Sequence, residues 1–513
     1  MNVLIDTLFE RWTHEDGSRP FLICPQGDDH IIITRDAFQA QINQLGHALR
    51  AVGVKIGDRV AVQVEKSPQA FALYFAVVKI GAVFLPLNTG YTITELTYFI
   101  DDAEPSVVVT DASTTQPLRD AAGRKDITFL TMNADGMGSL MENAQSQPDQ
   151  LDSTPRGDDD LAAILYTSGT TGRSKGAMLS HKNLLSNAEV LVNTWAFTDR
   201  DTLLHALPIY HTHGLFVAGN IMTRAGGVII YLPKFDAETM IRMMPQATSM
   251  MGVPTFYTRL LADSRLDRSL TQKMRLFISG SAPLLAETHL EFEARTSHRI
   301  LERYGMTETN MNTSNPYDGD RRAGTVGFPL PGIDIRVVDE KSGQVLPAGE
   351  IGVIEVKGDN VTSGYWRNEE KTAQSFRPDG YFITGDLGIE DHDGYVTIVG
   401  RDKDLIISGG LNIYPKEIED AINAIDGITE SAVIGIPHPD FGEGVVAVIV
   451  GANVGEGSAQ NVTAETIMDK LSQQLAKFKQ PKSIQFAQAL PRNTMGKVQK
   501  AEMRKTYAGL FQD

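Results

Sequence analysis

The residues best suited to chemistry lie in one loop, whose sequence is YTSGTTGRSKG (residues 166–176). It combines hydroxyls, two basic side chains and glycines that expose backbone N–H groups. These groups suit a polyanion with several oxygens, above all the triphosphate of ATP. The apolar residues 161–165 predict a buried strand before the loop, and residues 179–191 predict a helix after it. A phosphate would then lie near a helix N-terminus.

The loop is not a Walker sequence, because two residues separate Gly169 from Gly172 and because a glycine follows Lys175. Loops rich in Ser, Thr and Gly often bind nothing. Spacing alone therefore leaves both a phosphate site and an ordinary loop open.

Five further segments carry groups that could act with this loop. Thr307 and Glu308 could order a nucleotide and one magnesium ion, and Asp386 ends a strand where ribose hydroxyls are commonly bound. His211 and His213 would point to opposite faces of an extended chain, so a shared metal is not expected. Taken singly, each segment also has a purely structural explanation, such as packing, a turn or a solvated lysine. The segments are PIYHTHG (208–214), YGMTE (304–308), YFITGD (381–386), GRDKD (400–404) and PRNTMGKVQK (491–500).

The elements that must position these groups fall into three regions with different predicted secondary-structure patterns. The first part alternates strands and helices, which predicts a mostly parallel βαβ sheet. Residues 68–80 illustrate it as a helix with Ser67 as N-cap and Pro68 at its first position. Residues 111–160 are polar and weakly periodic, which predicts a long loop. The predicted elements of this part are strands 59–64, 82–85, 106–110 and 275–279 and helices 68–80 and 95–101.

From about residue 325, short strands separated by turns predict a small antiparallel β-barrel-like unit. Beyond residue 401, helices and strands alternate again and predict a compact α+β domain of ordinary size. We therefore expect an α/β protein with a large N-terminal domain (residues 1–401) and a small mobile C-terminal domain (residues 402–513). The predicted strands are 333–338, 351–356, 381–384, 395–399, 432–434, 445–450 and 484–486, and the predicted helices begin at Pro415 and near residue 466.

Composition limits the partners. The chain has 513 residues, too many for one core. Its net charge of −17 argues against nucleic acid or an anionic membrane as the main partner. Cys24 is the single cysteine, which excludes an internal disulfide and suits a reducing cytoplasm. The N-terminus lacks signal-peptide features, and no apolar run reaches the roughly 18 residues of a membrane span.

Read together, the order and wording of these segments resemble the adenylate-forming superfamily of acyl-CoA synthetases, luciferases and peptide-synthetase adenylation domains. The resemblance runs from about residue 6 to residue 500 and rests on YTSGTTGRSKG, YGMTE, TGD, GRDKDLI and PRNTMGK. It implies ATP, Mg²⁺ and coenzyme A as substrates and cofactors. It also implies that ATP or AMP contacts Thr167, Ser168, Gly169, Thr170, Thr171, Gly172, Lys175, Gly280, Ser281, Ala282, Glu302, Arg303, Tyr304, Gly305, Thr307, Asp386 and Arg401.

The same resemblance implies roles for the remaining candidates. Lys497 matches the catalytic lysine, which bridges the carboxylate and the α-phosphate, and Asp402 matches the hinge between domains. A carboxylate that attacks a phosphate needs preorganised positive charge, which Lys497 and magnesium would supply. A moving small domain would let one cleft run both half-reactions. Thr170 and Glu308 match magnesium-placing residues, and Ser408, Gly409, Gly410 and Leu411 match the segment that serves coenzyme A.

The residues before YGMTE bear on the acid that is activated. Relatives that activate aryl or fatty acids commonly have Gln-Gly there, whereas this chain has Glu302-Arg303. Together with His211, Arg259 and Ser281, Arg303 suits a second carboxylate. The pattern resembles malonyl-CoA synthetases and implies malonate or methylmalonate.

Alternatives remain at this point. Arg303 or Arg259 could instead pair with a structural acid such as Glu302 or Asp263. A short- or medium-chain monocarboxylate–CoA ligase is the runner-up, followed by a luciferase-like oxidase and a regulator without activity. We expect no fused carrier domain and a cytoplasmic location.

Overall fold

The computed structural model describes residues 1–13, 16–123, 126–167, 174–408, 411–451, 462–493 and 496–511. Its α-helices are α1 (Val3–Leu8), α2 (Arg35–Ala51), α3 (Pro68–Lys79), α4 (Ile93–Ala103), α5 (Ala112–Ala121), α6 (Ser139–Gln145), α7 (His181–Thr194), α8 (Asn220–Ala225), α9 (Ala237–Met243), α10 (Pro254–Leu261), α11 (Ala286–Thr296), α12 (Glu369–Gln374), α13 (Pro415–Asn423), α14 (Ala464–Gln474) and α15 (Lys500–Tyr507). Shorter helical segments are η1 (Glu10–Thr13), η2 (His213–Gly219), η3 (Met244–Gln246), η4 (Asp402–Asp404) and η5 (Lys477–Lys479).

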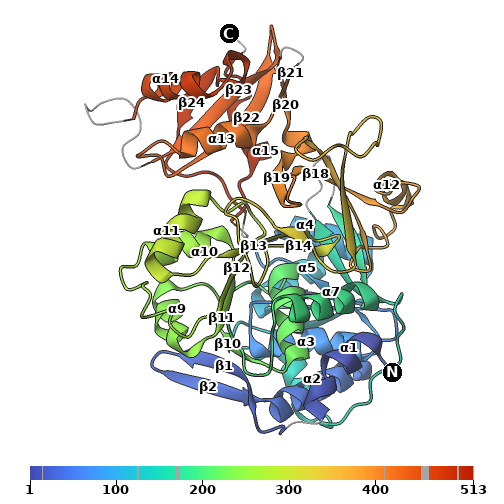
Figure 1. Cartoon of the computed structure of the whole chain (residues 1–513). Coiled ribbons are helices and arrows are strands. Elements are labelled where there is room, and N and C mark those ends of the chain that lie inside the picture. The colour runs from blue at the N-terminus through green and yellow to red at the C-terminus, as the bar shows by residue number, and fades with distance from the viewer. Residues whose placement is uncertain are drawn as a thin grey trace. The chain divides into compact units, whose positions relative to one another are not determined.

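The strands follow the same numbering as Figure 1. They are β1 (Pro20–Gln26), β2 (Asp29–Thr34), β3 (Arg59–Gln63), β4 (Val83–Pro86), β5 (Val107–Thr110), β6 (Thr128–Thr131), β7 (Leu161–Thr167), β8 (Lys175–Ser180), β9 (Thr202–His205), β10 (Val228–Tyr231), β11 (Ser249–Gly252), β12 (Leu276–Ser279), β13 (Leu301–Met306), β14 (Asn310–Ser314), β15 (Phe328–Pro329), β16 (Ile333–Val338), β17 (Gly352–Gly358), β18 (Phe382–Glu390), β19 (Val396–Arg401), β20 (Ile406–Ser408), β21 (Leu411–Ile413), β22 (Glu430–His438), β23 (Gly442–Val450) and β24 (Ser483–Phe486).

The chain divides into two compact units. Unit 1 comprises Met1–Ile335 and Val356–Phe382, and unit 2 comprises Arg336–Glu355 and Ile383–Asp513. The domain boundary predicted at residues 401 and 402 stays a prediction.

Two sheets form the centre of unit 1, and both confirm the predicted parallel βαβ pattern. The six-stranded sheet has the order β6-β5-β3-β4-β7-β8, with parallel pairing from β6 to β7. The nine-stranded sheet has the order β15-β14-β13-β12-β11-β9-β10-β1-β2, and its strands from β13 to β1 are parallel. Antiparallel strands close both sheets at their edges.

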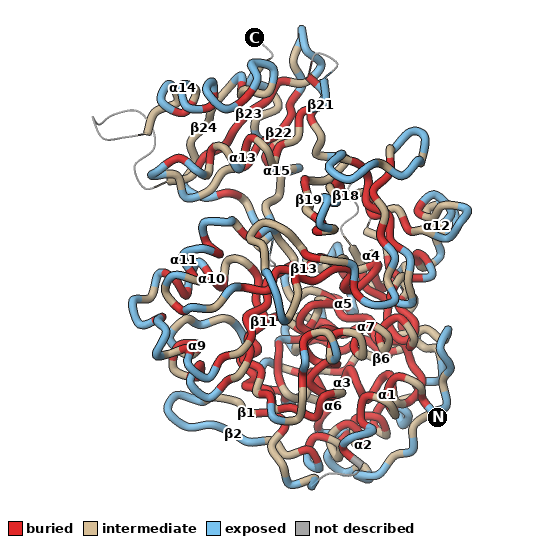
Figure 2. The backbone as a smooth tube through the Cα atoms, in the orientation of Figure 1, coloured by how far each residue is buried: buried red, intermediate tan, exposed pale blue. Residues whose placement is uncertain are grey.

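Helix α3 shows why these elements form. Ser67 caps it by accepting a hydrogen bond from the Ala70 N–H, and Pro68 occupies the first turn, as the sequence predicts. Apolar residues surround the helix on all sides, which is typical of a fully buried helix. Figure 2 shows this part of unit 1 as buried, and Figure 1 shows α3 close to α1 and α2.

Two expectations were only partly right. Residues 111–160 include a long stretch without helix or strand after α6, but they also contain α5, β6 and α6. Asp111 caps α5 by accepting hydrogen bonds from the Ser113 and Thr114 N–H groups. The weak apolar periodicity of this segment gave no indication of the helix, so the cap was its main local signal. The helix predicted over residues 179–191 begins only at His181, because β8 precedes it.

The predicted small β unit and C-terminal α+β unit are both present. The first is a four-stranded sheet with the order β16-β17-β18-β19. The second is a five-stranded sheet with the order β21-β20-β23-β22 and with β24 beside β23. None of the helices in the described part of the chain combines the length and the apolar character needed to cross a bilayer.

Candidate active site

The predicted phosphate loop joins two antiparallel strands rather than a strand and a helix. Thr167 of β7 pairs with Lys175 of β8, so the loop begins and ends at neighbouring backbone positions. Ser168, Gly169, Thr170, Thr171 and Gly172 lie outside the described residues. Strand β8 separates this loop from α7.

Helix α4 holds both ends of this hairpin loop. The Tyr98 hydroxyl donates to the carbonyl of Ser174 at 2.8 Å, directly after the loop. The Tyr166 hydroxyl, directly before it, donates to Asp102. A capping box at Thr92 and Glu95 stabilises the first turn of α4. The loop therefore starts and ends at ordered positions.

Lys175 and Glu308 share one neighbourhood through Tyr365. The Lys175 ammonium lies 5.6 Å from the centre of the Tyr365 ring, and the Tyr365 hydroxyl donates to Glu308 Oε1 at 3.0 Å. Burial and the nearby Lys371 lower the pKa of Lys175, and the Glu308 carboxylate opposes them. A candidate phosphate ligand and a buried carboxylate thus come from segments more than one hundred residues apart.

The segment YGMTE forms the turn of a second hairpin. Strands β13 and β14 pair antiparallel, with a bulge between Tyr304 and Gly305. A Cβ on Gly305 would lie 1.9 Å from the Asn310 carbonyl oxygen, so only glycine fits there. Tyr304 is buried, whereas Gly305 and Thr307 at the turn are half-exposed. This exposure leaves the turn accessible to a ligand.

Arg303 is the unusual side chain of this hairpin. It is 3 % exposed, and its Nε, Nη1 and Nη2 atoms have no hydrogen-bond partner among the described residues. Burial lowers the pKa of Arg303 to about 9, which still leaves the guanidinium charged at neutral pH. A buried, charged donor without partners is costly unless an anion satisfies it.

Strand β12 provides the surface on which Arg303 lies. A Cβ on Gly280 would stand 2.4 Å from Arg303 Cζ, so the guanidinium rests directly on the Gly280 backbone. The next residue, Ser281, has a φ of 70° and turns its hydroxyl toward His213 Nδ1, at 3.2 Å. The Ala282 that follows is half-exposed.

His213 is the functional candidate that sequence reasoning missed. It is fully buried, and burial together with the nearby Arg303 charge lowers its pKa well below 6.5. Its Nε2 atom has no partner among the described residues. The sequence predicts His211 for the acyl pocket and places the two histidines on opposite faces if the chain is extended, but a π-helix, η2, starts at His213. That rare helix leaves no sequence signal, and only the repeated histidine in PIYHTHG pointed to both residues.

The structural-acid explanation of Arg303 is wrong. Glu302 Oε1 lies 2.9 Å from His289 Nδ1 and accepts from the Gly324 N–H at 3.1 Å. The Glu302 side chain therefore contacts α11 and the loop at Gly324. Arg303, next along β13, keeps all three nitrogens unpaired within the described part of the chain.

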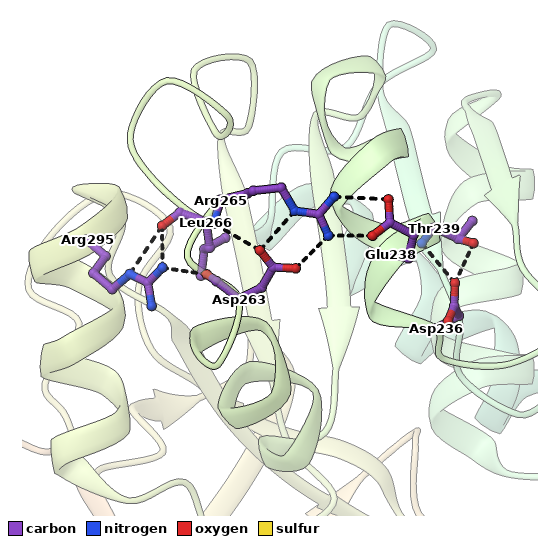
Figure 3. A network of polar contacts seen from close by, with 7 residues as sticks. All are labelled: Asp236, Glu238, Thr239, Asp263, Arg265, Leu266 and Arg295. Atoms are coloured by element: carbon purple, nitrogen blue, oxygen red, sulfur yellow. Dashed lines mark hydrogen bonds and ion pairs between the residues drawn. The ribbon is translucent and has the colours of Figure 1, made fainter. Parts of the chain in front are cut away.

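Arg259 differs from Arg303. It is an exposed residue of α10, and its guanidinium lies 5.7 Å from the centre of the Phe235 ring. Its other suggested partner, Asp263, receives hydrogen bonds from Arg265, which lower the pKa of Asp263 to about 2. Figure 3 shows Arg265 bridging Asp263 and Glu238, with Arg295 joined to the same loop. The described contacts do not bring Arg259 to Arg303.

The ribose-binding candidates meet in unit 2. Asp386 of β18 and Arg401 of β19 occupy paired positions, and Asp386 Oδ1 lies 2.6 Å from Arg401 Nε. The Asp386 N–H also donates to the Thr384 hydroxyl at 3.0 Å. The buried Asp386 carboxylate is thus held in place at a paired position of the β18–β19 hairpin.

Lys497 lies in a turn of unit 2. Its N–H donates to Asn493 Oδ1 at 2.9 Å, and the neighbouring Gly496 has a φ of 75°. Its side chain is exposed. Burial lowers the pKa of Lys403 to about 8, with the Lys497 charge contributing. Unit 2 therefore gathers positive charge near Lys497.

The hinge and coenzyme A candidates fall in the same unit. Asp402 begins the short η4 helix after β19. Ser408 is buried and Leu411 is exposed, and the two face each other in the β20–β21 hairpin. Gly409 and Gly410 lie outside the described residues.

Comparison with known proteins identifies the family. Residues 9–366 match the AMP-binding enzyme model, and residues 417–497 match the AMP-binding enzyme C-terminal domain. The crystal structure of ATP-bound MatB from Rhodopseudomonas palustris shares 54 % identity, covers 99 % of both chains and superposes with a TM-score of 0.95.

Two curated relatives are more distant. A malonate–CoA ligase of Arabidopsis thaliana is 32 % identical over 88 % of this chain and 78 % of its own. A feruloyl-CoA synthase of Amycolatopsis is 36 % identical over 93 % of this chain and 94 % of its own. With a family model that matches most of its length and the same fold as a solved relative, this chain is a member of the AMP-binding enzyme family.

Proposed function

We propose that this protein is an AMP-forming malonate–CoA ligase, with methylmalonate as a possible second substrate. A malonate carboxylate oxygen attacks the α-phosphorus of ATP, and the bond to the β-phosphate breaks with release of pyrophosphate. The thiolate of coenzyme A then attacks the carbonyl carbon of malonyl-AMP, and AMP leaves.

The unpaired, buried guanidinium of Arg303 carries this proposal. Malonate keeps a second carboxylate that does not react, and a guanidinium is well shaped to bind one through two parallel hydrogen bonds. The Ser281 hydroxyl and the His213 Nε2 atom add polar groups at the same place. A monocarboxylic acid would leave the Arg303 charge buried and unsatisfied. Relatives that are malonate–CoA ligases, from Arabidopsis thaliana and Mus musculus, support the same substrate.

ATP would occupy the hairpin loop that ends at Lys175, with Asp386 and Arg401 as candidates for the ribose. A magnesium ion fits the carboxylate of Glu308, because such ions take one or two protein oxygens and complete their coordination with phosphate and water. It would neutralise charge on the leaving pyrophosphate. The described residues contain no cluster of three or more His, Cys, Asp or Glu side chains that could hold a metal by themselves.

Lys497 is our candidate for the charge that stabilises the pentavalent phosphorus during adenylation. The hinge role of Asp402, the coenzyme A segment, the acyl role of His211 and the cytoplasmic location stay predictions. We assign the acid-binding role to Arg303 before Arg259, because the buried Arg303 guanidinium has no hydrogen-bond partner in the described part of the chain, whereas Arg259 is exposed.

A carboxylate panel tests the proposal. Pyrophosphate exchange and CoA-dependent AMP formation are measured with malonate, methylmalonate, acetate, butyrate and ferulate. We expect malonate to give the highest kcat/KM. A higher value for acetate or butyrate would instead support a monocarboxylate ligase.

A further inference from the structure

A buried polar chain of Lys66, His205 and Gly214 lies behind the proposed acid pocket, all of it in unit 1. The Lys66 Nζ atom lies 3.2 Å from His205 Nδ1 and donates to the His205 carbonyl at 2.9 Å. His205 Nε2 lies 2.9 Å from the carbonyl oxygen of Gly214. Lys66 also lies 4.3 Å from the centre of the Tyr231 ring. None of these side chains takes part in the chemistry described above.

The contacts determine where the protons lie. A carbonyl oxygen only accepts, so His205 Nε2 carries the hydrogen that is donated to Gly214. Burial and the neighbouring Lys66 lower the pKa of His205 well below 6.5, so the ring is neutral. Its Nδ1 atom therefore has no hydrogen and must accept one from Lys66. The hydrogen bonds with Lys66 and with Gly214 are therefore compatible with the same tautomer of His205.

Gly214 belongs to the first turn of η2, directly after His213. A Cβ at Gly214 would lie 2.1 Å from the Pro208 carbonyl oxygen, so the backbone is closely packed there. Single π-helical turns occur often at functional sites because their backbone places a side chain where an α-helix would not. The His205 hydrogen bond fixes the Gly214 carbonyl. Gly214 directly follows His213, whose ring contacts the Ser281 hydroxyl.

We propose that Lys66 and His205 are positioning residues for the acid pocket, which act by holding the first turn of η2 so that His213 stays beside Ser281 and Arg303. This inference rests on the proposed function, because it assigns His213 to the bound malonate. Neither residue touches the substrate. They set the affinity for the second carboxylate and the preference for malonate over a monocarboxylic acid.

The test separates KM from kcat in four variants. Lys66→Met replaces the amine by an apolar chain of similar length, and His205→Leu removes both ring nitrogens. His205→Asn is too short to reach Gly214, whereas the amide of His205→Gln can still donate to its carbonyl. We expect the first three to raise KM for malonate about tenfold while KM for ATP changes less than about twofold. His205→Gln should stay within about threefold of wild type.

The preference for malonate is the second readout. The ratio of kcat/KM for malonate to that for acetate should fall about tenfold in Lys66→Met, His205→Leu and His205→Asn. Lys79→Met is the matched control, because Lys79 is a half-buried lysine whose ammonium donates to Asn43 Oδ1 at 2.7 Å. It should keep the wild-type ratio.

Two results would overturn the inference. One is an unchanged malonate-to-acetate ratio in folded Lys66→Met and His205→Asn, and the other is an equal loss of kcat for both acids. If wild type itself prefers acetate, the proposed function fails as well. If His205→Leu does not fold, the comparison of His205→Asn with His205→Gln decides.

Discussion

At the scale of the residue, the proposed acid pocket is marked by a buried guanidinium, that of Arg303, without a hydrogen-bond partner among the described residues. Arg303 and Glu302 are neighbours on β13, yet only Glu302 has hydrogen-bond partners within the described structure, namely His289 and Gly324. Alternation along a strand sends the two side chains to opposite faces. One side chain therefore stabilises the fold, and the other is available for a ligand.

Replacing Arg303 by glycine should lower kcat/KM for malonate by about two orders of magnitude, because a charge-assisted, bidentate interaction is lost. Activity with butyrate should rise relative to malonate, since the pocket loses a buried charge. Steady-state kinetics with both acids measure the effect. Arg259→Met, assayed beside it, should change kcat/KM for malonate less than about threefold. An unchanged malonate preference in Arg303→Gly would exclude Arg303 from substrate selection.

Replacing Lys497 by alanine should reduce malonate-dependent pyrophosphate exchange by about 10²–10³, the typical loss for one preorganised electrostatic group. Transfer from added malonyl-AMP to coenzyme A should be retained, because that step does not need charge at the α-phosphate. Lys479→Ala removes another lysine of unit 2, which pairs with Glu417 at 2.6 Å, and serves as the control. Robust exchange in Lys497→Ala would disprove its catalytic role.

At the scale of the element, the ends of strands and helices place the site. Gly280, on which Arg303 lies, directly follows β12, and β13 has a bulge at Gly305 shortly before it turns into β14. Strands β7 and β8 hold the phosphate loop between paired residues, and α4 holds both of its ends. The candidate site therefore includes glycines, Gly280 and Gly305, at which an added Cβ would lie too close to a neighbouring atom.

Gly280→Ala tests the role of this close approach. The added Cβ would stand within 2.6 Å of Arg303 Cζ, Nε and Nη1 and must displace the guanidinium. We expect KM for malonate to rise at least about tenfold, with KM for ATP nearly unchanged. Gly123→Ala is the control, since a Cβ there meets nothing within 4 Å. Equal kinetics of the two variants would show that Arg303 is not held against β12.

At the scale of the whole molecule, unit 1 buries several histidines in their neutral form. Burial lowers the pKa of His181 to about 4 and lowers the pKa values of His205 and His213 well below 6.5. Below pH 6.5 the unfolded chain binds protons at these rings while the folded chain does not. The free energy of unfolding must therefore decrease as the pH falls from 6.5 toward 4.

We expect each such histidine to remove about 1.4 kcal/mol of stability per pH unit in this range. Urea unfolding between pH 7.5 and pH 5 measures the slope. In His181→Leu, which replaces a buried ring with no partner for either nitrogen among the described residues, the slope should decrease by about one proton. Stability that does not change between pH 6.5 and pH 5 would contradict the prediction.

Local sequence determined a large part of this protein. Caps such as Ser67, alternating apolar runs and turn residues specify their elements through short-range contacts, and most predicted strands and helices are present. The amino-acid sequences of the motifs were enough to suggest the family and the candidate residues. Local patterns failed at β8, a hairpin strand that overlaps the start of the predicted helix, and at α5, where the signal is a single cap.

Tertiary structure alone decided which of the candidates meet. Whether a charge is paired depends on every element around it. The sequence therefore could not distinguish the exposed Arg259 from the buried Arg303, which has no hydrogen-bond partner among the residues that the structure describes. It likewise gave no reason to consider His213 beside His211, because His213 begins a π-helix that a distant Lys66–His205 pair supports. Residue types follow from the sequence, but burial and partners arise only when remote segments pack together.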